Sequence, residues 1–219
     1  MKRRGPLLTL AAVAVLAIVL LVINVSKESD SEAPVATSQP AVTSSPVVAE
    51  PTTTAAPSVT PFPAKADYVG EVATATGAIT LSIAVEGDKA IAYACDGKAI
   101  ESWLQGSATN GVLNLAGKNN SRLEGSLDGP NVTGTLWIGD KSWNFIAAPV
   151  QPPAGLYVYQ DNGTRDSWIV AADGTVTGVQ RGADGATAPA PALSPDGKAV
   201  VNGRTVTATQ VSGGDSNVF

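Results

Sequence analysis

The feature that most constrains the fold of this 219-residue chain is a series of short alternating segments separated by tight-turn residues. Between Asp67 and Ala148, apolar and polar residues alternate, as in Ile79–Val85, and pairs such as Asp96-Gly97 and Asn110-Gly111 separate the runs. Period-two alternation bounded by Asp-Gly or Asn-Gly is typical of antiparallel hairpins. Residues 65–149 are therefore predicted to form a meander of about eight strands, either a barrel or a sandwich.

The interior of this meander should be filled by the larger apolar residues of its strands. We expect the following residues to lie mostly inside: Ile79, Leu81, Ile83, Val85, Ile91, Tyr93, Ile100, Trp103, Leu113, Leu115, Leu123, Leu127, Leu136, Ile138, Trp143 and Phe145.

The sequence pattern of residues 150–211 predicts a smaller antiparallel region of about five strands. It begins after the break at Gln151–Gly155, and its last hairpin turns at Asn202-Gly203. The sequence leaves open whether this region extends the first sheet or forms a subdomain. Residues 212–219 are expected to form a polar tail.

The N-terminal region predicts a membrane anchor. Residues 6–25 carry no charge and include enough apolar residues for a helix of roughly 30 Å, the thickness of a bilayer core. Because residues 1–5 are basic, we expect them in the cytoplasm and the C-terminal region outside the plasma membrane. The alternative is a cleaved signal peptide, but the apolar run is longer than usual and no small-x-small site follows it.

Residues 26–64 contain recurrent prolines among Ser, Thr, Ala and Val. Proline at this spacing prevents helices and interrupts strand ladders. A disordered linker between the anchor and the β-rich region is the expected result.

Composition excludes several classes of function. The net charge is −5, and from Lys65 onward there are ten basic and fifteen acidic residues, which argues against nucleic-acid binding. The chain has no histidine, and Cys95 is its only cysteine. The commonest general base, an intrachain disulfide and a thiolate metal site are thereby excluded. We expect Cys95 to be a buried strand residue; the alternative is that it pairs with a second chain.

No catalytic residue, metal site or cofactor is predicted, and we expect a protein that is not an enzyme. Paired carboxylates of a hydrolase would have to come from Glu71, Glu86, Glu101 and Glu124. Solvated strand faces and loop ends are the simpler interpretation of these four residues.

Aromatic residues are the candidate contacts for a ligand or a partner. In a chain with only 5% aromatics, they are expected mainly in the core; turned outward, they would form a binding face. The candidates are Trp103, Trp137, Trp143, Tyr157, Tyr159 and Trp168.

Two stretches resemble a known group of proteins. Ala92–Gly97 through Trp103-Leu104, followed by Val132–Thr135, resembles a domain of uncharacterised proline-rich membrane proteins of the actinobacterial envelope. Pro153–Tyr157 with Trp168–Val170 resembles the segment that follows this domain. The resemblance covers most of residues 67–211 and implies an envelope location, but no activity.

Three functions are compatible with these features. The first is a single-pass envelope protein whose outer β-domain, without enzymatic activity, binds or scaffolds an envelope protein or polymer. The second is a carrier that holds a small apolar ligand or lipid inside a closed barrel. The third and weakest is a carboxylate-dependent hydrolase.

Overall fold

The computed structural model describes residues 60–216. The predicted anchor at 6–25 and most of the predicted linker at 26–64 lie outside the described residues. Within residues 60–216, no helix is long and apolar enough to cross a membrane.

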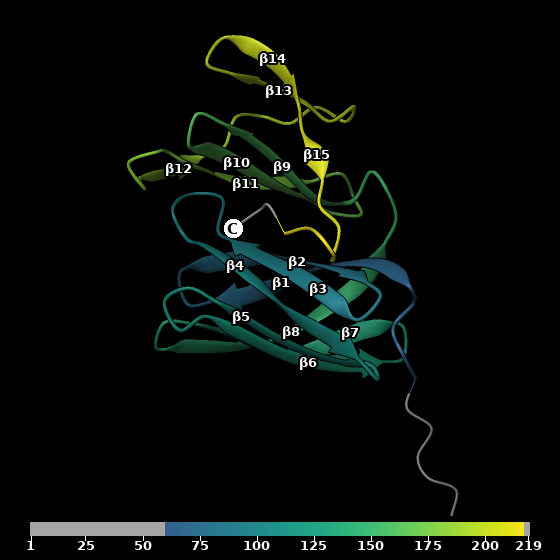
Figure 1. Cartoon of the computed structure of the whole chain (residues 1–219). Helices are drawn as coiled ribbons and strands as arrows, with labels where there is room; N and C mark the ends of the chain where they lie inside the picture. Colours follow the sequence, from purple (N-terminus) through teal and green to yellow (C-terminus); the bar gives the residue numbers. More distant parts are fainter. Residues whose placement is uncertain (1–59, 217–219) are drawn as a thin grey trace, which may run out of the picture. The chain divides into compact units, whose positions relative to one another are not determined.

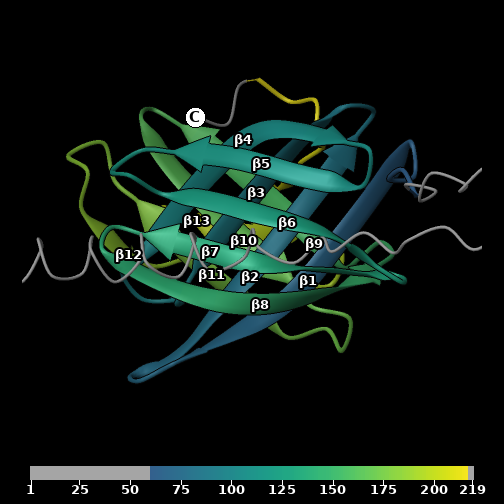
Figure 2. The ribbon, with the colours of Figure 1, turned by 90° about the horizontal axis from the view of Figure 1, so that it is seen from below.

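Eight antiparallel strands form a closed barrel (Figure 1). Each strand pairs with the next in the chain, and β8 closes the barrel by pairing with β1, where Val69 lies opposite Ala148. Seen from below, β4 to β8 lie side by side in chain order (Figure 2). The prediction of an all-β antiparallel fold is confirmed, and of its two forms the chain adopts the barrel. The strands are β1 (Lys65–Thr74), β2 (Gly77–Glu86), β3 (Lys89–Cys95), β4 (Glu101–Thr109), β5 (Val112–Gly117), β6 (Arg122–Asp128), β7 (Asn131–Ile138) and β8 (Lys141–Val150).

The turn residues explain the short connections. Asn110 and Gly111, between β4 and β5, have φ values of 53° and 71°. Two consecutive residues with positive φ are what a two-residue hairpin of type I′ requires. The Asn-Gly pair thus sets the register of this hairpin.

The inside of the barrel is filled with apolar side chains that form one contiguous cluster. Phe62 belongs to this cluster, although the sequence placed it in the linker, and its ring meets that of Tyr68 edge to face at 6.2 Å. Most of the predicted interior residues lie there: Ile79, Leu81, Ile83, Val85, Leu113, Leu115, Leu123, Leu136 and Phe145, with Leu127, Ile138 and Trp143 partly buried against them.

Ile100 is a correction to the predicted core, because it is 42% exposed. It precedes β4, in a connection where the Asp96 carboxylate accepts hydrogen bonds from the N–H groups of Lys98, Ala99 and Ile100 at 2.9 Å. This turn holds the backbone and leaves the Ile100 side chain exposed to solvent.

A second, five-stranded sheet follows in the order β12-β11-β10-β9-β15, and a two-stranded hairpin, β13-β14, accompanies it. The region from 150 onward is therefore not an extension of the barrel sheet. Its strands are β9 (Gly155–Asp161), β10 (Thr164–Val170), β11 (Val176–Arg181), β12 (Thr187–Pro189), β13 (Lys198–Val201), β14 (Arg204–Thr207) and β15 (Thr209–Gln210).

The second sheet covers the outer face of one side of the barrel. Ile91 and Tyr93 of β3 and Trp103 of β4 are buried as predicted, but they lie outside the barrel, in a cluster with Leu156 and Ile169 of the second sheet. We call this contact between the outer face of the barrel and the second sheet the joint. Burial of β3 on both faces explains why Ile91–Cys95 has only apolar residues instead of an alternating pattern.

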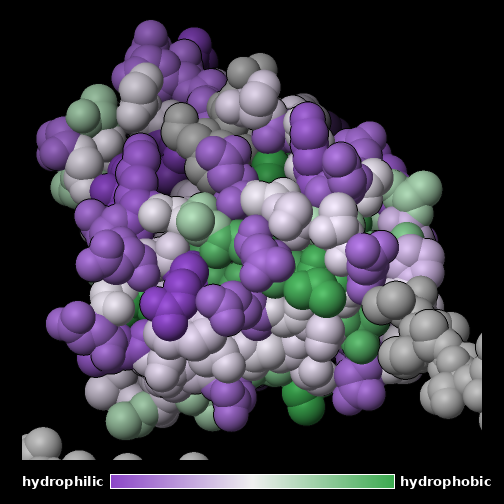
Figure 3. All heavy atoms as spheres, turned by 60° about the horizontal axis from the view of Figure 1, so that its bottom comes forward, coloured by the Kyte–Doolittle hydropathy of each residue, from purple (hydrophilic) through white to green (hydrophobic). Residues whose placement is uncertain are grey.

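The other face of the second sheet carries a smaller cluster with the β13-β14 hairpin. Trp168 is its largest buried residue, and its Nε1 donates to the Pro191 carbonyl at 2.7 Å. Ser212, in the predicted tail, donates from its hydroxyl to Glu86 at the end of β2. The surface seen in Figure 3 is mainly hydrophilic or neutral, with smaller hydrophobic areas between.

Candidate binding cavity at the joint

Glu101, the first residue of β4, has a buried carboxylate at the joint. Its side chain is only 1% exposed and accepts hydrogen bonds from Arg165 Nη2 at 3.1 Å, from Arg181 Nε and from the Tyr93 hydroxyl at 3.2 Å. These donors come from β10, β11 and β3, so one carboxylate connects the barrel with the second sheet. Burial raises the pKa of Tyr93 well above its ordinary value, so this hydroxyl stays a donor.

The ladder between β10 and β11 explains how the two guanidinium groups meet. Arg165 and Arg181 are directly opposite each other in this antiparallel pair. Two like charges at such positions repel each other unless an opposite charge lies between them. The buried carboxylate of Glu101 supplies that charge.

Trp103 forms one wall of the joint. The centroid of its ring lies 4.6 Å from that of Tyr93. The guanidinium carbon of Arg165 lies 4.9 Å from the Trp103 ring centroid. The second distance is that of a cation–π interaction. Because Trp103 is only 8% exposed, it stabilises the joint rather than offering an open aromatic platform.

A cavity of about 470 Å³ opens beside these residues. Its lining includes Arg165, Arg181 and Lys118 as cations and Glu101 as its single carboxylate. Neutral polar side chains complete the lining, among them Gln105, Asn119 and Ser121. We call this space the joint cavity; its lining carries more positive than negative charge.

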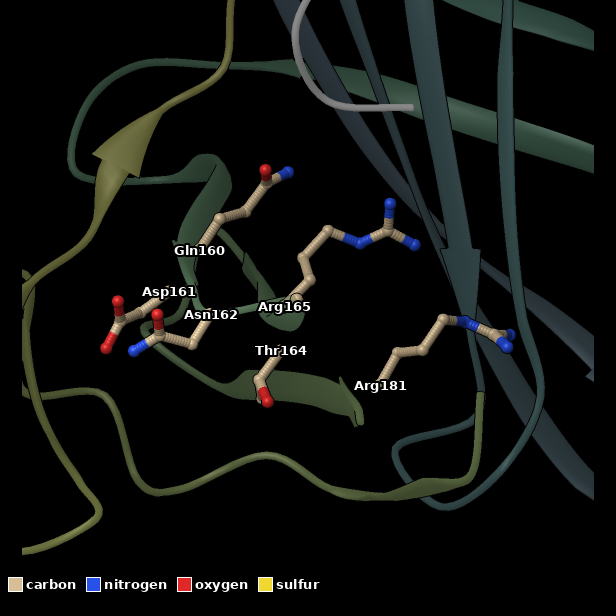
Figure 4. Close-up of a pocket in the computed structure, with 7 residues that line it drawn as sticks. Gln160, Asp161, Asn162, Thr164, Arg165 and Arg181 are labelled. Atoms are coloured by element: carbon tan, nitrogen blue, oxygen red, sulfur yellow. The ribbon is translucent and has the colours of Figure 1, made fainter. Parts of the chain in front are cut away.

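The same two arginines also line a second cavity of about 340 Å³, together with Gln160, Asn162, Thr164 and the carboxylate Asp161. Figure 4 shows that Arg165 and Arg181 extend in the same direction from neighbouring strands, away from the β9–β10 turn. Both arginines therefore belong to the lining of the two cavities.

The predicted contact residues do not form one face. Trp103 alone among them lines the joint cavity. On the barrel, Trp137 has the Arg122 guanidinium carbon 3.9 Å from its ring centroid, and Trp143 packs partly against the barrel interior. The remaining three, Tyr157, Tyr159 and Trp168, belong to the cluster on the far face of the second sheet.

The carboxylates are dispersed as well. Glu86 is bonded to Ser212, and Glu124 lies on the exposed barrel surface, 3.6 Å from Arg122. Glu101 already accepts three hydrogen bonds. Residues 60–216 hold no group of three or more His, Cys, Asp or Glu side chains that would bind a metal ion.

Cys95 is buried at the joint, as predicted. Burial raises the pKa of its thiol to about 12, so the thiolate needed for nucleophilic or redox chemistry does not form near neutral pH.

The sequence missed the residues that give the cavity its charge, Arg165, Arg181 and Lys118. The arginines lie 64 and 80 positions from Glu101 in the chain. The only clue in the sequence was their opposition across one hairpin, which becomes visible when the Asp173-Gly174 turn is used to align β10 with β11.

Comparison of the chain with models of protein families, with curated proteins and with solved structures found no match. The resemblance to actinobacterial proline-rich membrane proteins stays an expectation from the sequence.

Proposed function

We propose that this chain is a membrane-tethered binding protein of the cell envelope, without enzymatic activity. Residues 6–25 would anchor it, and the β-domain would bind an envelope polymer outside the membrane. The observation that carries the proposal is the joint cavity, a space of about 470 Å³ lined by polar and apolar groups beside a network of paired charges. Spaces of this size with a few fixed polar groups are typical of binding sites.

The chemistry of the joint favours binding over catalysis. A general base or nucleophile needs a group whose lone pair or proton is available to substrate. The Glu101 carboxylate is instead engaged by two guanidinium groups and a phenol, and the Cys95 thiol is buried. These groups are suited to holding the two sheets and the cavity walls in place.

The carrier alternative has less support. A ligand inside the barrel would have to displace large side chains that are 0–3% exposed and in mutual contact, such as Leu81, Leu113 and Phe145. Removing such contacts costs several kcal/mol.

Two measurements on the full chain test the proposal. Protease added to intact cells should release the β-domain, and full-length protein in zwitterionic nanodiscs should cosediment with purified cell-wall fragments. Protection of the domain until cells are permeabilised would contradict the proposed location. Failure to cosediment with wall fragments would contradict the binding role.

A further inference from the structure

We propose that the joint cavity binds an acidic saccharide, with the carboxylate or phosphate of the sugar lying against Arg181 and Lys118. This inference rests on the proposed function and names the ligand class of that site. It combines four observations: the local charge, the exposure of Arg181, the neutral polar lining and the second cavity.

The local charge is opposite in sign to that of the domain. The described residues carry ten basic and fifteen acidic side chains, whereas the joint cavity is lined by three cations and one carboxylate. A positive site on an acidic surface attracts individual anionic groups, while the rest of the surface repels a densely charged polymer. Nucleic acid is therefore a poor candidate for this site.

Arg181 is the cation best placed to reach a ligand. Its Nε donates to Glu101 and its Nη1 donates to the Gly185 carbonyl at 2.9 Å, which orients the guanidinium group. Its side chain is nevertheless 40% exposed. A guanidinium held in one orientation binds an anionic oxygen group with less loss of side-chain entropy than a mobile one. Lys118, in the exposed turn between β5 and β6, adds a second cation at the rim.

The neutral lining favours a sugar over a peptide. Gln105, Asn119 and Ser121 offer amide and hydroxyl groups that donate to and accept from sugar hydroxyls. A bound peptide would need apolar pockets for its anchor side chains. Apart from the buried Trp103, the joint cavity has only Ala116 and Ile138 for that purpose.

The second cavity suggests an extended ligand. It shares Arg165 and Arg181 with the joint cavity and adds Gln160, Thr164 and Asp161, whose carboxylate is paired with Arg204 at 3.1 Å (Figure 4). One sugar unit with its anionic group at Arg181 would thus have polar side chains on both sides. This arrangement fits a chain of sugars better than a lone anion.

The test uses full-length protein in zwitterionic nanodiscs and isothermal titration calorimetry. The probes are trigalacturonate, glucose 6-phosphate, neutral maltotriose, triglutamate and inorganic phosphate. We expect at least one of the two acidic sugars to bind more tightly than the other three probes, with an affinity that falls as salt rises. Comparing trigalacturonate with glucose 6-phosphate identifies the anionic group. Tighter binding of maltotriose, triglutamate or inorganic phosphate than of both acidic sugars would overturn the inference.

Variants locate the site. Lys118→Gln and Arg181→Gln should each weaken binding of the acidic sugar about 10-fold, the loss of one charge-assisted contact. Arg122→Gln removes the same charge from β6, outside the cavity lining, and should leave binding unchanged. Because Lys118 lies in an exposed turn, its variant tests the site even if Arg181→Gln loosens the joint. Unchanged binding by Lys118→Gln would overturn the inference.

The same variants separate this inference from the proposed function. If wild-type protein and Lys118→Gln retain wall fragments equally, the ligand assignment fails and the binding role stands. If acidic sugars bind but wall fragments do not, the ligand assignment stands and the envelope role fails.

Discussion

Glu101→Gln is the variant that tests the joint most directly. The glutamine keeps the size of the side chain but removes the negative charge between two guanidinium groups. Its NH₂ group would also face donors instead of accepting from them. Because the Glu101 side chain is 1% exposed and that of Arg165 is 17% exposed, water cannot fully replace the lost carboxylate as the partner of Arg165.

The magnitude follows from the burial of each partner. Removing one partner of a buried ion pair typically costs 3–5 kcal/mol, about 2–4 kcal/mol here because Arg181 can turn partly toward solvent. For a domain of this size, the melting temperature should fall on the order of 5–15 °C. The assay is urea unfolding of the full-length protein, followed by tryptophan fluorescence, since Trp103 lies at the joint.

Glu124→Gln is the matched control. Glu124 and Arg122 are 59% and 51% exposed and 3.6 Å apart, so this change should alter the free energy of unfolding by less than about 1 kcal/mol. A double-mutant cycle of Glu101→Gln with Arg181→Gln should give a coupling energy of at least about 1 kcal/mol. If Glu101→Gln lowers the free energy of unfolding no more than Glu124→Gln does, the ion pairs of Glu101 do not stabilise the joint and the argument is refuted.

Three further outcomes are expected. The Cys95 thiol should not react with Ellman's reagent at pH 8 in the native protein and should react fully in urea; native reactivity would contradict its burial. Burial raises the pKa of Asp166 in the folded protein above its ordinary value, so the charged carboxylate destabilises the fold at pH values above this raised pKa. The free energy of unfolding therefore increases as the pH falls from the folded-state pKa to the pKa of Asp166 in the unfolded chain. Asp166→Asn should accordingly raise the urea midpoint at pH 7 but not at pH 3, and equal effects at both would exclude this cause. Gly134→Ala should lower stability by about 1–3 kcal/mol, because a Cβ there would lie 2.1 Å from the Glu124 carbonyl oxygen; unchanged denaturation curves would show that β6 and β7 can separate freely.

The parts of the fold that depend on local chemistry were predictable. Turn pairs such as Asn110-Gly111 and the alternation in β2 indicate antiparallel hairpins, because both act within a few residues. Closure of the barrel depends on the pairing of β1 with β8, about eighty positions later, which no local pattern encodes.

The joint was harder to predict for a related reason. Tyr93 and Trp103 are correctly expected to be buried, but a buried residue can face either side of a strand whose two faces are both covered. The unbroken apolar run Ile91–Cys95 is the sequence pattern expected of a strand that is covered on both faces. Sequence position alone does not bring Arg165 and Arg181 to Glu101, since their meeting requires two sheets to dock.

The burial of β3 on both faces makes the β-domain indivisible. A shortened protein ending at Val150 would keep every strand of the barrel, yet it would turn Ile91, Tyr93 and Trp103 outward to water and leave Glu101 without its arginines. Such a product would expose a large apolar surface and be prone to aggregation. Insertions and deletions are therefore expected in the loops of this domain, whereas loss of the second sheet is not expected to leave a stable barrel.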